Sequence, residues 1–244
     1  MKKNCYLPFV CALGVACYQQ PPETAATVTT EAVAGNEQEP VDGEPALEKL
    51  GLIDIATLDE GIRVQLVYAT PYNFMGKTLY KNIRRAYLQP DAAQKLLRAY
   101  KALKKIRPDL TLLVYDAARP LSVQWEMWNA VKGTEWNYYV KNPGNGGGMH
   151  NFGAAVDLTL ADCTGQPLSM GTPYDYFGYE AHIDKEKELV QTGRITPREW
   201  ENRLLLRKVM TGAGFRTVKS EWWHFNACSL EEAKKQYEVI RLGD

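Results

Sequence analysis

Two residues of the chain have types and a spacing that suit a metal centre. A glycine-rich stretch, residues 146–148, leads to His150, and Asp157 follows seven residues later within an apolar run. Desolvating an unpaired carboxylate costs far more than the surrounding packing returns, so Asp157 needs a partner. A histidine and an aspartate held close together indicate a metal site that still lacks a ligand.

The best candidate for that ligand is His224, which follows Glu221 by three residues in a tryptophan-containing segment. With His150 and Asp157 it would leave the fourth position of a zinc ion to water, as in catalytic sites. Zinc lowers the pKa of such a water to about 7. Glu221 would then serve as general base and pass the proton to the leaving amine. Taken singly, His150 is typical of a loop histidine and His224 of a packed one. The third histidine, His182, is expected at the surface or beside the site, since three ligands are already present.

Arg119 lies just after another apolar run, in the segment Asp116–Pro120. A guanidinium there could polarise a carbonyl group and stabilise the oxyanion of a tetrahedral intermediate. The alternatives are a surface arginine, or one that pairs with Asp116 to hold the loop. The sequence leaves these interpretations open.

The elements that must position these residues do not alternate as regular βαβ units. This pattern favours an α+β fold, a mostly antiparallel sheet flanked by helices and carrying the zinc site. Capping boxes at Thr196 and Ser229 mark the starts of two helices. Strands are predicted over residues 62–68, 110–115, 154–160, 215–219 and 221–227, and helices over 90–107, 122–131, 197–212 and 230 to the C-terminus.

The alternation of apolar and polar residues in the strand predicted at 154–160 indicates on which face of the sheet the Asp157 side chain lies. Val156, Leu158 and Leu160 share one face, and Asp157 shares the other with small or polar residues. Asp157 is therefore expected on the floor of the site.

Glu221 and His224 pose a different problem, because strand residues three positions apart point to opposite faces. If both serve one site, the backbone must bend or bulge near Trp222 and Trp223.

The composition is that of a globular domain with a hydrophobic core. Hydrophobic residues make up 45% and charged residues 24% of 244 residues, and the formal net charge is zero. No basic excess is present to neutralise phosphates, which argues against a nucleic-acid partner. Cys163 and Cys228 lie in the predicted domain, and a disulfide between them is allowed in an exported protein but not required.

The N-terminus predicts export. Residues 1–17 combine a short positive start with an apolar run too short to span a bilayer, which is typical of a secretory signal. Leu13–Cys17 is similar to a bacterial lipoprotein cleavage box, and ordinary signal-peptidase cleavage is the alternative. We expect a periplasmic protein, or a lipoprotein facing the periplasm or outside that touches the membrane only through Cys17. Residues 18–45 are predicted to be a flexible linker and 46–244 the catalytic domain.

Three motifs together resemble the zinc D-alanyl-D-alanine dipeptidases. This family includes the vancomycin-resistance dipeptidases and is related to D,D-carboxypeptidases and hedgehog-type domains. The resemblance covers about residue 53 to the C-terminus. The motifs are His150-x-x-Gly153-x-Ala155-x-Asp157, Glu221-Trp222-Trp223-His224 and Asp116-x-x-Arg119-Pro120, with further matches at Tyr68-Ala69-Thr70-x-x-Asn73-Phe74-x-Gly76 and Met170-Gly171-Thr172-x-x-Asp175.

The resemblance implies one zinc ion per chain, bound by His150, Asp157 and His224. It implies Glu221 as the acid and base, and Arg119 as the stabiliser of the transition state.

The resemblance also implies where substrate binds. Tyr68 and Asp175 are expected where the family holds the free ammonium of the dipeptide, and a carboxylate suits that task. We place Asp116 with them among the substrate-binding residues. The alternative for Asp175 is a turn residue, since it follows Gly171-Thr172-Pro173.

One position departs from the family pattern. The family usually carries serine at the position of Gly148, where it helps to bind the carboxylate of the substrate. The zinc site survives this change, but recognition of the terminal carboxylate is left open, with Tyr80 as one candidate.

The resulting hypothesis is zinc-dependent hydrolysis of the dipeptide D-alanyl-D-alanine in cell-wall peptide turnover. One alternative is a D,D-carboxypeptidase that trims peptidoglycan stem peptides. The other is a non-catalytic zinc domain that binds the cell wall, against which the presence of Glu221 argues, because a structural site needs no base.

Overall fold

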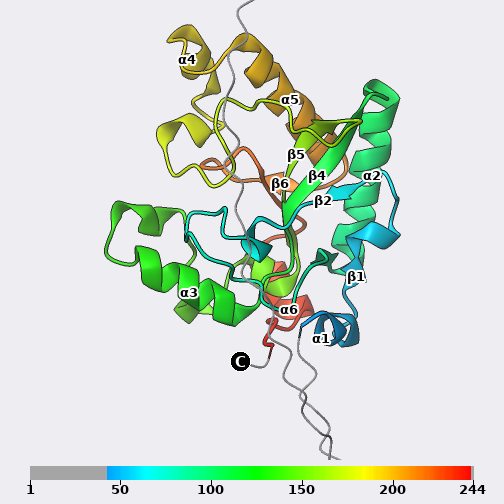
Figure 1. Ribbon diagram of the computed structural model, residues 1–244, viewed down its shortest axis with the longest axis vertical. Coiled ribbons are helices and arrows are strands. Elements are labelled where there is room, and N and C mark those ends of the chain that lie inside the picture. The colour runs from blue at the N-terminus through cyan, green and yellow to red at the C-terminus, as the bar shows by residue number, and fades with distance from the viewer. Residues whose placement is uncertain (1–42, 243–244) are drawn as a thin grey trace, which may run out of the picture. The chain divides into compact units, whose positions relative to one another are not determined.

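The computed structural model of the chain describes residues 43–242, in which helices flank a central sheet of five strands (Figure 1). The strand order is β2-β4-β5-β7-β6. β2 runs parallel to β4, and every other neighbouring pair is antiparallel. The predicted α+β fold with a mostly antiparallel sheet is therefore confirmed. The strands are β2 (Arg63–Val64), β4 (Leu110–Asp116), β5 (Ala155–Asp162), β7 (His224–Asn226) and β6 (Arg216–Thr217).

The longest helices cover the sheet from two sides. α2 and α5 pack against each other and against the sheet, and α3 lies on the other side of the strands (Figure 1). A second, two-stranded sheet joins β1 (Ile53–Asp54) to β3 (Tyr87–Leu88). The helices are α1 (Glu44–Lys49), α2 (Pro90–Ile106), α3 (Leu121–Val131), α4 (Glu186–Gln191), α5 (Pro197–Gly212) and α6 (Leu230–Gln236).

Local signals explain where these helices begin. α2 starts with Pro90, whose missing N–H is not needed in the first turn. α5 starts with a complete capping box, in which Thr196 and Glu199 each bond the backbone N–H of the other. Ser229 and Glu232 cap α6 in the same way. These starts agree with the sequence-based prediction.

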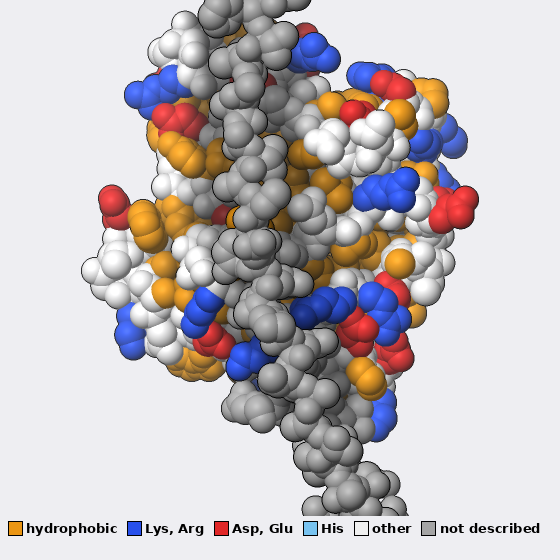
Figure 2. Space-filling model, in the orientation of Figure 1, with side chains coloured by type: hydrophobic (Ala, Val, Ile, Leu, Met, Phe, Trp, Pro, Cys, Tyr) orange, Lys and Arg blue, Asp and Glu red, His pale blue; other side chains and the backbone are white. Residues whose placement is uncertain are grey.

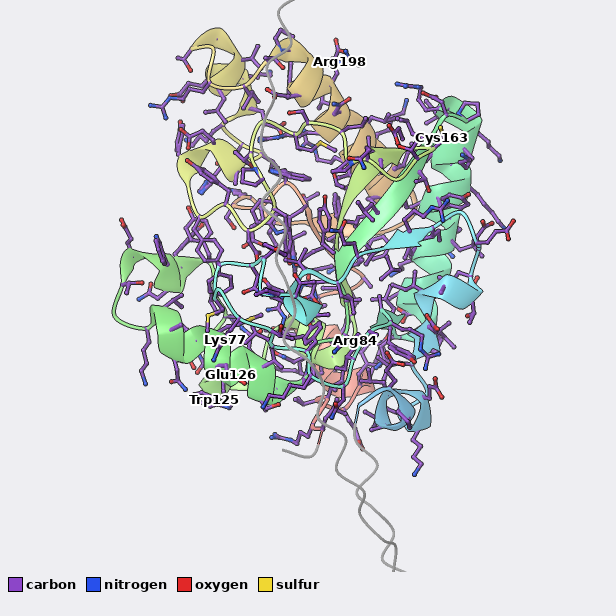
Figure 3. The ribbon with its side chains drawn as sticks, viewed as in Figure 1. Lys77, Arg84, Trp125, Glu126, Cys163 and Arg198 are labelled. Atoms are coloured by element: carbon purple, nitrogen blue, oxygen red, sulfur yellow. The ribbon has the colours of Figure 1, made fainter. Side chains whose placement is uncertain are left out.

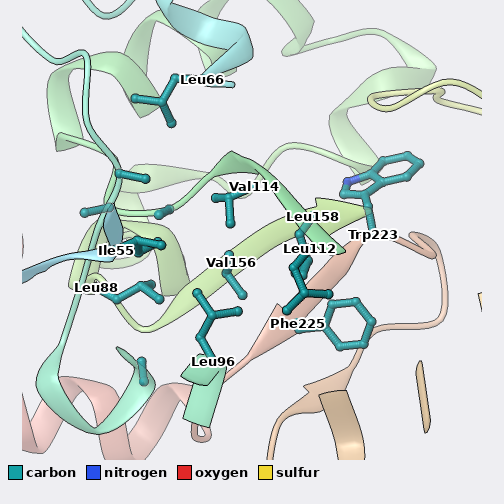
Figure 4. Close-up of a cluster of buried hydrophobic side chains, with 14 of the residues drawn as sticks. Ile55, Leu66, Leu88, Leu96, Leu112, Val114, Val156, Leu158, Trp223 and Phe225 are labelled. Carbon is teal, nitrogen blue, oxygen red and sulfur yellow. The ribbon is translucent and has the colours of Figure 1, made fainter. Parts of the chain in front are cut away.

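The hydrophobic core lies under one face of β5. Val156, Leu158 and Leu160 are fully buried and pack with Leu96 of α2 and Phe225 of β7 (Figure 4). The predicted alternation is correct, and Asp157 points to the opposite face. That face is buried as well, because Asp157 is only 3% exposed.

The predicted bend before His224 is present. β7 begins only at His224, and Trp222 and Trp223 form a bend outside the strand. Asp157 stands opposite His224 on one side and opposite Asp116 of β4 on the other. Asp116, Asp157 and His224 therefore lie side by side on three neighbouring strands. The candidate site is built around these three side chains.

Four elements are shorter than predicted. The strands expected at 215–219 and 221–227 span only Arg216–Thr217 and His224–Asn226. The strand expected at 62–68 ends at Val64, because the chain turns into a 3₁₀ helix, Val67–Ala69, that carries Tyr68. The last helix ends at Gln236 instead of the C-terminus. Beyond it, Ile240 bonds through its N–H and its carbonyl to Asn151 and Leu121, which holds this segment in an extended path.

The described chain begins just before the predicted domain start at residue 46. Glu44 opens α1, and Leu47 is fully buried. Arg85 pairs with Glu44 and Glu48 and so ties this helix to the domain. The predicted signal, the boundary at residue 17 and most of the predicted linker at 18–45 lie outside the described residues. The last two positions of that linker, Glu44 and Pro45, belong to α1.

The surface carries charges of both signs. On the face in Figure 2, lysine and arginine side chains are interspersed with acidic ones, and Figure 3 shows one such pair, Lys77 with Glu126, joined at 2.8 Å. Within residues 43–242 no helix is both long and apolar enough to cross a membrane. Cys163, beyond the end of β5 (Figure 3), and Cys228, before α6, are both free thiols, so the disulfide that the sequence allowed is not formed.

Candidate active site

His150, Asp157 and His224 form a compact group of three ligand-type side chains. His150 Nε2 lies 3.3 Å from Asp157 Oδ1 and 3.2 Å from His224 Nδ1. His224 Nδ1 lies 2.9 Å from the same oxygen. A tetrahedral zinc ion with bonds of about 2.0–2.1 Å spaces its ligands by about 3.3 Å. Two of the three separations match this spacing, and the third, between Asp157 and His224, is shorter at 2.9 Å.

Hydrogen bonds on the far side of each ring fix which nitrogen faces the group. His150 Nδ1 donates to the carbonyl of Ala117 at 2.7 Å, and His224 Nε2 donates to Asn226 Oδ1 at 2.8 Å. In the neutral rings the facing nitrogens then carry lone pairs. Three acceptors converge with no proton between them, which is the arrangement that a bound cation satisfies.

The negative charge of Asp157 stabilises a positive charge placed between the three side chains, as the pKa values of Asp157 and His224 indicate. Burial alone would raise the pKa of Asp157, but the imidazoles of His150 and His224 outweigh it and hold that pKa well below its usual range. Burial lowers the pKa of His224, yet the charge and hydrogen bond of Asp157 outweigh it and raise the pKa to about 9. The other carboxylate oxygen of Asp157 accepts a hydrogen bond from Tyr174 at 3.0 Å, which leaves Oδ1 free for a metal.

Glu221 lies beside this group without belonging to it. The bend at Trp222 and Trp223 brings its carboxylate to 3.9 Å from His224 Nδ1. No described residue donates a hydrogen bond to it. Burial raises the pKa of Glu221 to about 7. A carboxylate with such a pKa can both accept and return a proton near neutral pH.

The guanidinium of Arg119 lines the cavity and is held in place by hydrogen bonds to Asp116 and Gln124. Its Nε and Nη2 donate to Asp116 Oδ2 at 3.0 and 2.6 Å, and its Nη1 donates to Gln124 at 2.8 Å. The guanidinium lies over the ring of Tyr68, 5.1 Å from its centre, and Nη2 is 4.0 Å from Asp157 Oδ2. Arg119 thus pairs with Asp116, which was one of the interpretations, and its side chain also lines the cavity. Its role as an oxyanion stabiliser stays a prediction.

Asp175 and Tyr68 form a second polar centre. The Tyr68 hydroxyl donates to Asp175 Oδ2 at 2.7 Å. Burial raises the pKa of Asp175 well above its ordinary value, and no cation among residues 43–242 pairs with it. Asp175 also has a φ of 58°, in the left-handed region that few non-glycine residues adopt. A half-buried carboxylate without a cation is suited to receive an ammonium group.

One cavity of about 330 Å³ joins these groups. Asp157 of β5 lines it, together with polar residues from segments outside the strands, which include Arg119, Lys141, Asp175 and Glu221. Aromatic side chains also line it, and Phe177 packs against Phe74 and lies parallel to Tyr139 with ring centres 5.0 Å apart. The arrangement offers a metal centre, a base, a guanidinium and a carboxylate to one small ligand.

Comparison with known proteins agrees with this geometry. A family model described as D-ala-D-ala dipeptidase matches residues 48–240. The chain belongs to this dipeptidase family. A D-alanyl-D-alanine dipeptidase of Escherichia coli K12 is 34% identical over 174 residues, which are 71% of this chain and 83% of that protein. A D-alanyl-D-alanine dipeptidase of Enterococcus faecium is 28% identical over 194 residues, 72% of this chain and 91% of that protein.

The structure of this dipeptidase-family chain brings together most of the residues singled out from the sequence. The three expected ligands form one group, with Glu221 and Arg119 beside it, and Tyr68 is bonded to Asp175. His182 lies outside the group and contacts the Tyr139 hydroxyl, as expected for a residue that is not a ligand.

Two placements differ from expectation. Asp116 is completely buried and faces Arg119, so it orients the guanidinium and does not meet the cavity. Tyr80, the candidate for the terminal carboxylate, is also buried and donates to Asp116 Oδ1 at 2.5 Å. Its hydroxyl is committed to that bond, so the candidate is wrong.

Sequence reasoning missed four residues of the site: Tyr174, Gln124, Asn226 and Lys141. Two of them had a local signal. Tyr174 adjoins Asp175, and Asn226 lies two residues after His224, on the same face of β7. Gln124 and Lys141 meet only through tertiary structure, with Gln124 Nε2 donating to the Lys141 carbonyl at 2.8 Å.

Proposed function

We propose that the chain hydrolyses D-alanyl-D-alanine to two molecules of D-alanine. The observation that carries this proposal is the group of three converging acceptors with the half-buried carboxylate of Glu221 beside it, to which no described residue donates a hydrogen bond. Membership of the dipeptidase family supports the choice of substrate. The relatives from Escherichia coli and Enterococcus faecium carry this activity in their names.

Zinc is the metal that fits the donor set best. Two imidazole nitrogens and one carboxylate oxygen are typical of catalytic zinc sites, which keep a position open. We propose one ion per chain, held by His150, Asp157 and His224. When bound, zinc supplies Lewis-acid polarisation of the scissile carbonyl and lowers the pKa of water to about 7.

Glu221 moves the proton in the proposed reaction. Its carboxylate takes a proton from the attacking water and then delivers it to the nitrogen of the leaving D-alanine. Burial keeps its pKa near that of the working solution, which allows both transfers.

Arg119 stabilises the negative charge that develops on the carbonyl oxygen. Asp116 and Gln124 fix the guanidinium before substrate arrives, so little reorganisation is needed during the reaction. The pair with Asp116 leaves other guanidinium N–H groups available to the oxyanion.

Asp175 and Tyr68 hold the ammonium end of the dipeptide. An ammonium group would supply the missing counter-charge for Asp175, which is half-buried without one. A peptide extended at its amino end has no ammonium at that place, and it would meet the aromatic wall of Phe74, Tyr139 and Phe177. This favours the dipeptide over the stem peptide of a D,D-carboxypeptidase.

The proposal is tested with purified protein loaded with zinc. D-alanine release from D-alanyl-D-alanine is expected, with none from a stem pentapeptide, and a chelator stops it until zinc is returned. Glu221→Ala is expected to lower kcat by about 10²- to 10⁴-fold with zinc still bound. Full turnover by that variant would remove Glu221 from its role, and release from the pentapeptide would favour the carboxypeptidase. Binding of peptide without any turnover would favour a non-catalytic domain.

We further propose export, with Cys17 as the lipid-anchored first residue of the mature protein. The support is the pattern of residues 1–17, and an exported dipeptidase would meet the D-alanyl-D-alanine released by wall turnover. Radiolabelled fatty acid is expected to enter the wild type and not Cys17→Ser. Mature protein recovered from the cytoplasm would contradict export.

A further inference from the structure

A free dipeptide brings two opposite charges into the cavity, and the structure provides an evident partner for only one of them. Asp175 is placed for the ammonium end. The carboxylate end needs a cation, and two side chains with permanent positive charge line the cavity, Arg119 and Lys141. Only a side chain whose positive charge is not already paired with a carboxylate of the protein can bind the carboxylate of the substrate.

Arg119 is already neutralised. Asp116 accepts two of its N–H groups, and Asp116 itself is fully buried and cannot turn elsewhere. Lys141 differs, because no carboxylate among residues 43–242 forms an ion pair with its ammonium, which makes no hydrogen bond to them either. Lys141 is therefore the cation of the cavity without a counter-charge.

The backbone of Lys141 is fixed relative to the catalytic groups. Gln124 is 2% exposed and spans the gap, since its Oε1 accepts from Arg119 and its Nε2 donates to the Lys141 carbonyl. Asn151 holds the neighbouring loop in a similar way, by donating to the Arg119 carbonyl and accepting from the Gly148 N–H. These hydrogen bonds fix the backbone of Lys141 next to the segment from Gly148 to Asn151, which includes His150.

The aliphatic part of Lys141 lies directly over Gly148. A Cβ atom placed on Gly148 would be 3.3 Å from Lys141 Cβ and 3.4 Å from Cγ. The absence of a side chain at Gly148 gives the lysine its path past the loop, two residues before His150. A long stem that packs on the protein while its ammonium stays in water is the usual behaviour of lysine.

We propose that Lys141 receives the terminal carboxylate of the substrate. This inference rests on the proposed dipeptidase function and deepens it. The enzyme then binds both charged ends of its substrate, the ammonium group through Asp175 and the terminal carboxylate through Lys141. A peptide with a free carboxylate is required, and the lysine takes over a task that a hydroxyl at position 148 would otherwise share.

The test compares two substrates that differ only in the charge at the carboxyl end, D-alanyl-D-alanine and D-alanyl-D-alaninamide. With wild-type zinc enzyme we expect a KM for the amide about 10- to 100-fold higher, the range for a hydrogen bond between charged groups. Lys141→Met is expected to raise the KM for the dipeptide by a similar factor, with kcat within about threefold, and to leave the KM for the amide at the wild-type value. Lys141→Arg keeps the charge and is expected to restore most of the affinity.

Lys132→Met is the matched control, because Lys132 is exposed, lies just after α3 and does not line the cavity. It is expected to behave as wild type with both substrates. An equal rise in KM for both substrates in Lys141→Met would show a merely structural role and overturn the proposal. So would an unchanged KM for the dipeptide. Zinc enzyme that cleaves neither substrate would refute the proposed function itself, and this inference with it.

Discussion

Asp157 and His224 stand directly opposite each other in the register of β5 and β7, with Asp157 Oδ1 2.9 Å from His224 Nδ1. Side chains of a directly opposed antiparallel pair project from the same face of the sheet. The backbone ladder therefore sets the spacing of these two ligands. His150 reaches the same point from a short 3₁₀ helix, Met149–Phe152, and its carbonyl accepts from the Arg119 N–H at 3.0 Å.

A ligand group held by a sheet is expected to survive removal of its metal. We predict that the chelated protein stays folded and melts about 10 °C lower, because metal present at a thousandfold its Kd stabilises by about 4 kcal/mol. Thermal melts with and without a chelator measure this. His224→Ala should abolish the metal-dependent shift, whereas His182→Ala, with its ring outside the group, should keep it. Loss of the shift in both variants would contradict the assignment.

The metal-free protein is expected to lose stability as the pH rises. Folding raises the pKa of Glu221 from 4.5 to about 7 and that of His224 from 6.5 to about 9. A group with a raised folded-state pKa contributes stability at low pH, and this is lost as the pH rises through the folded value. Melting temperatures of chelated protein should therefore fall between about pH 5 and pH 9.

Variants separate the contributions of Glu221 and His224 to that fall, to which the raised pKa of Asp175 adds. Glu221→Gln should flatten the lower part of the curve, below about pH 7, and leave the upper part in place. Zinc should reverse the trend, because its ligands bind it in their deprotonated forms. A chelated wild type that gains stability across this range would show that the buried groups are not protonated as inferred.

Structural features that depend only on residues close together in the sequence could be predicted. The alternation around Asp157 gave its face, the capping box at Thr196 gave the start of α5, and the conflict between Glu221 and His224 required the bend that is found. Each depends on the geometry of neighbouring residues, which periodicity reveals.

Features that depend on distant pairing could not be predicted. Tyr80 was a reasonable candidate for substrate, but its hydroxyl is bound to Asp116, 36 residues away. Gln124 and Lys141 meet only because α3 and the loop after it fold back on each other. No periodicity or motif encodes such contacts, and they decide which charges remain free for substrate.

Asp175→Asn is predicted to weaken substrate binding without weakening the fold. Asparagine tolerates a φ near +58° and still accepts the hydrogen bond of Tyr68, so the backbone and this contact persist. Removing a half-buried charge also avoids the cost that raises the pKa of Asp175, so the melting temperature at pH 8 should not fall. The KM for D-alanyl-D-alanine should rise at least about tenfold. The exposed Asp184→Asn is the control, and an equal KM in both variants would remove Asp175 from ammonium binding.

Gly148→Ser tests the other end of the substrate. Gly148 has φ −105° and ψ 179°, ordinary extended backbone, so a side chain brings no backbone strain. The added Cβ would press on Lys141 at 3.3 Å, but the exposed lysine can shift by a few tenths of an ångström. The melting temperature should therefore stay within about 2 °C of wild type.

The informative background for this substitution is Lys141→Met, which lacks the proposed carboxylate receptor. There the serine hydroxyl is expected to recover about 3- to 10-fold of the lost affinity for D-alanyl-D-alanine, which corresponds to the net contribution of an ordinary hydrogen bond. In the wild-type background the gain should be smaller, because Lys141 already meets the carboxylate. Gly148→Ala is the matched control, since it adds the same Cβ without the hydroxyl. Recovery by alanine as large as that by serine would show that packing over the loop, and not a hydrogen bond to the substrate, sets the affinity at this position.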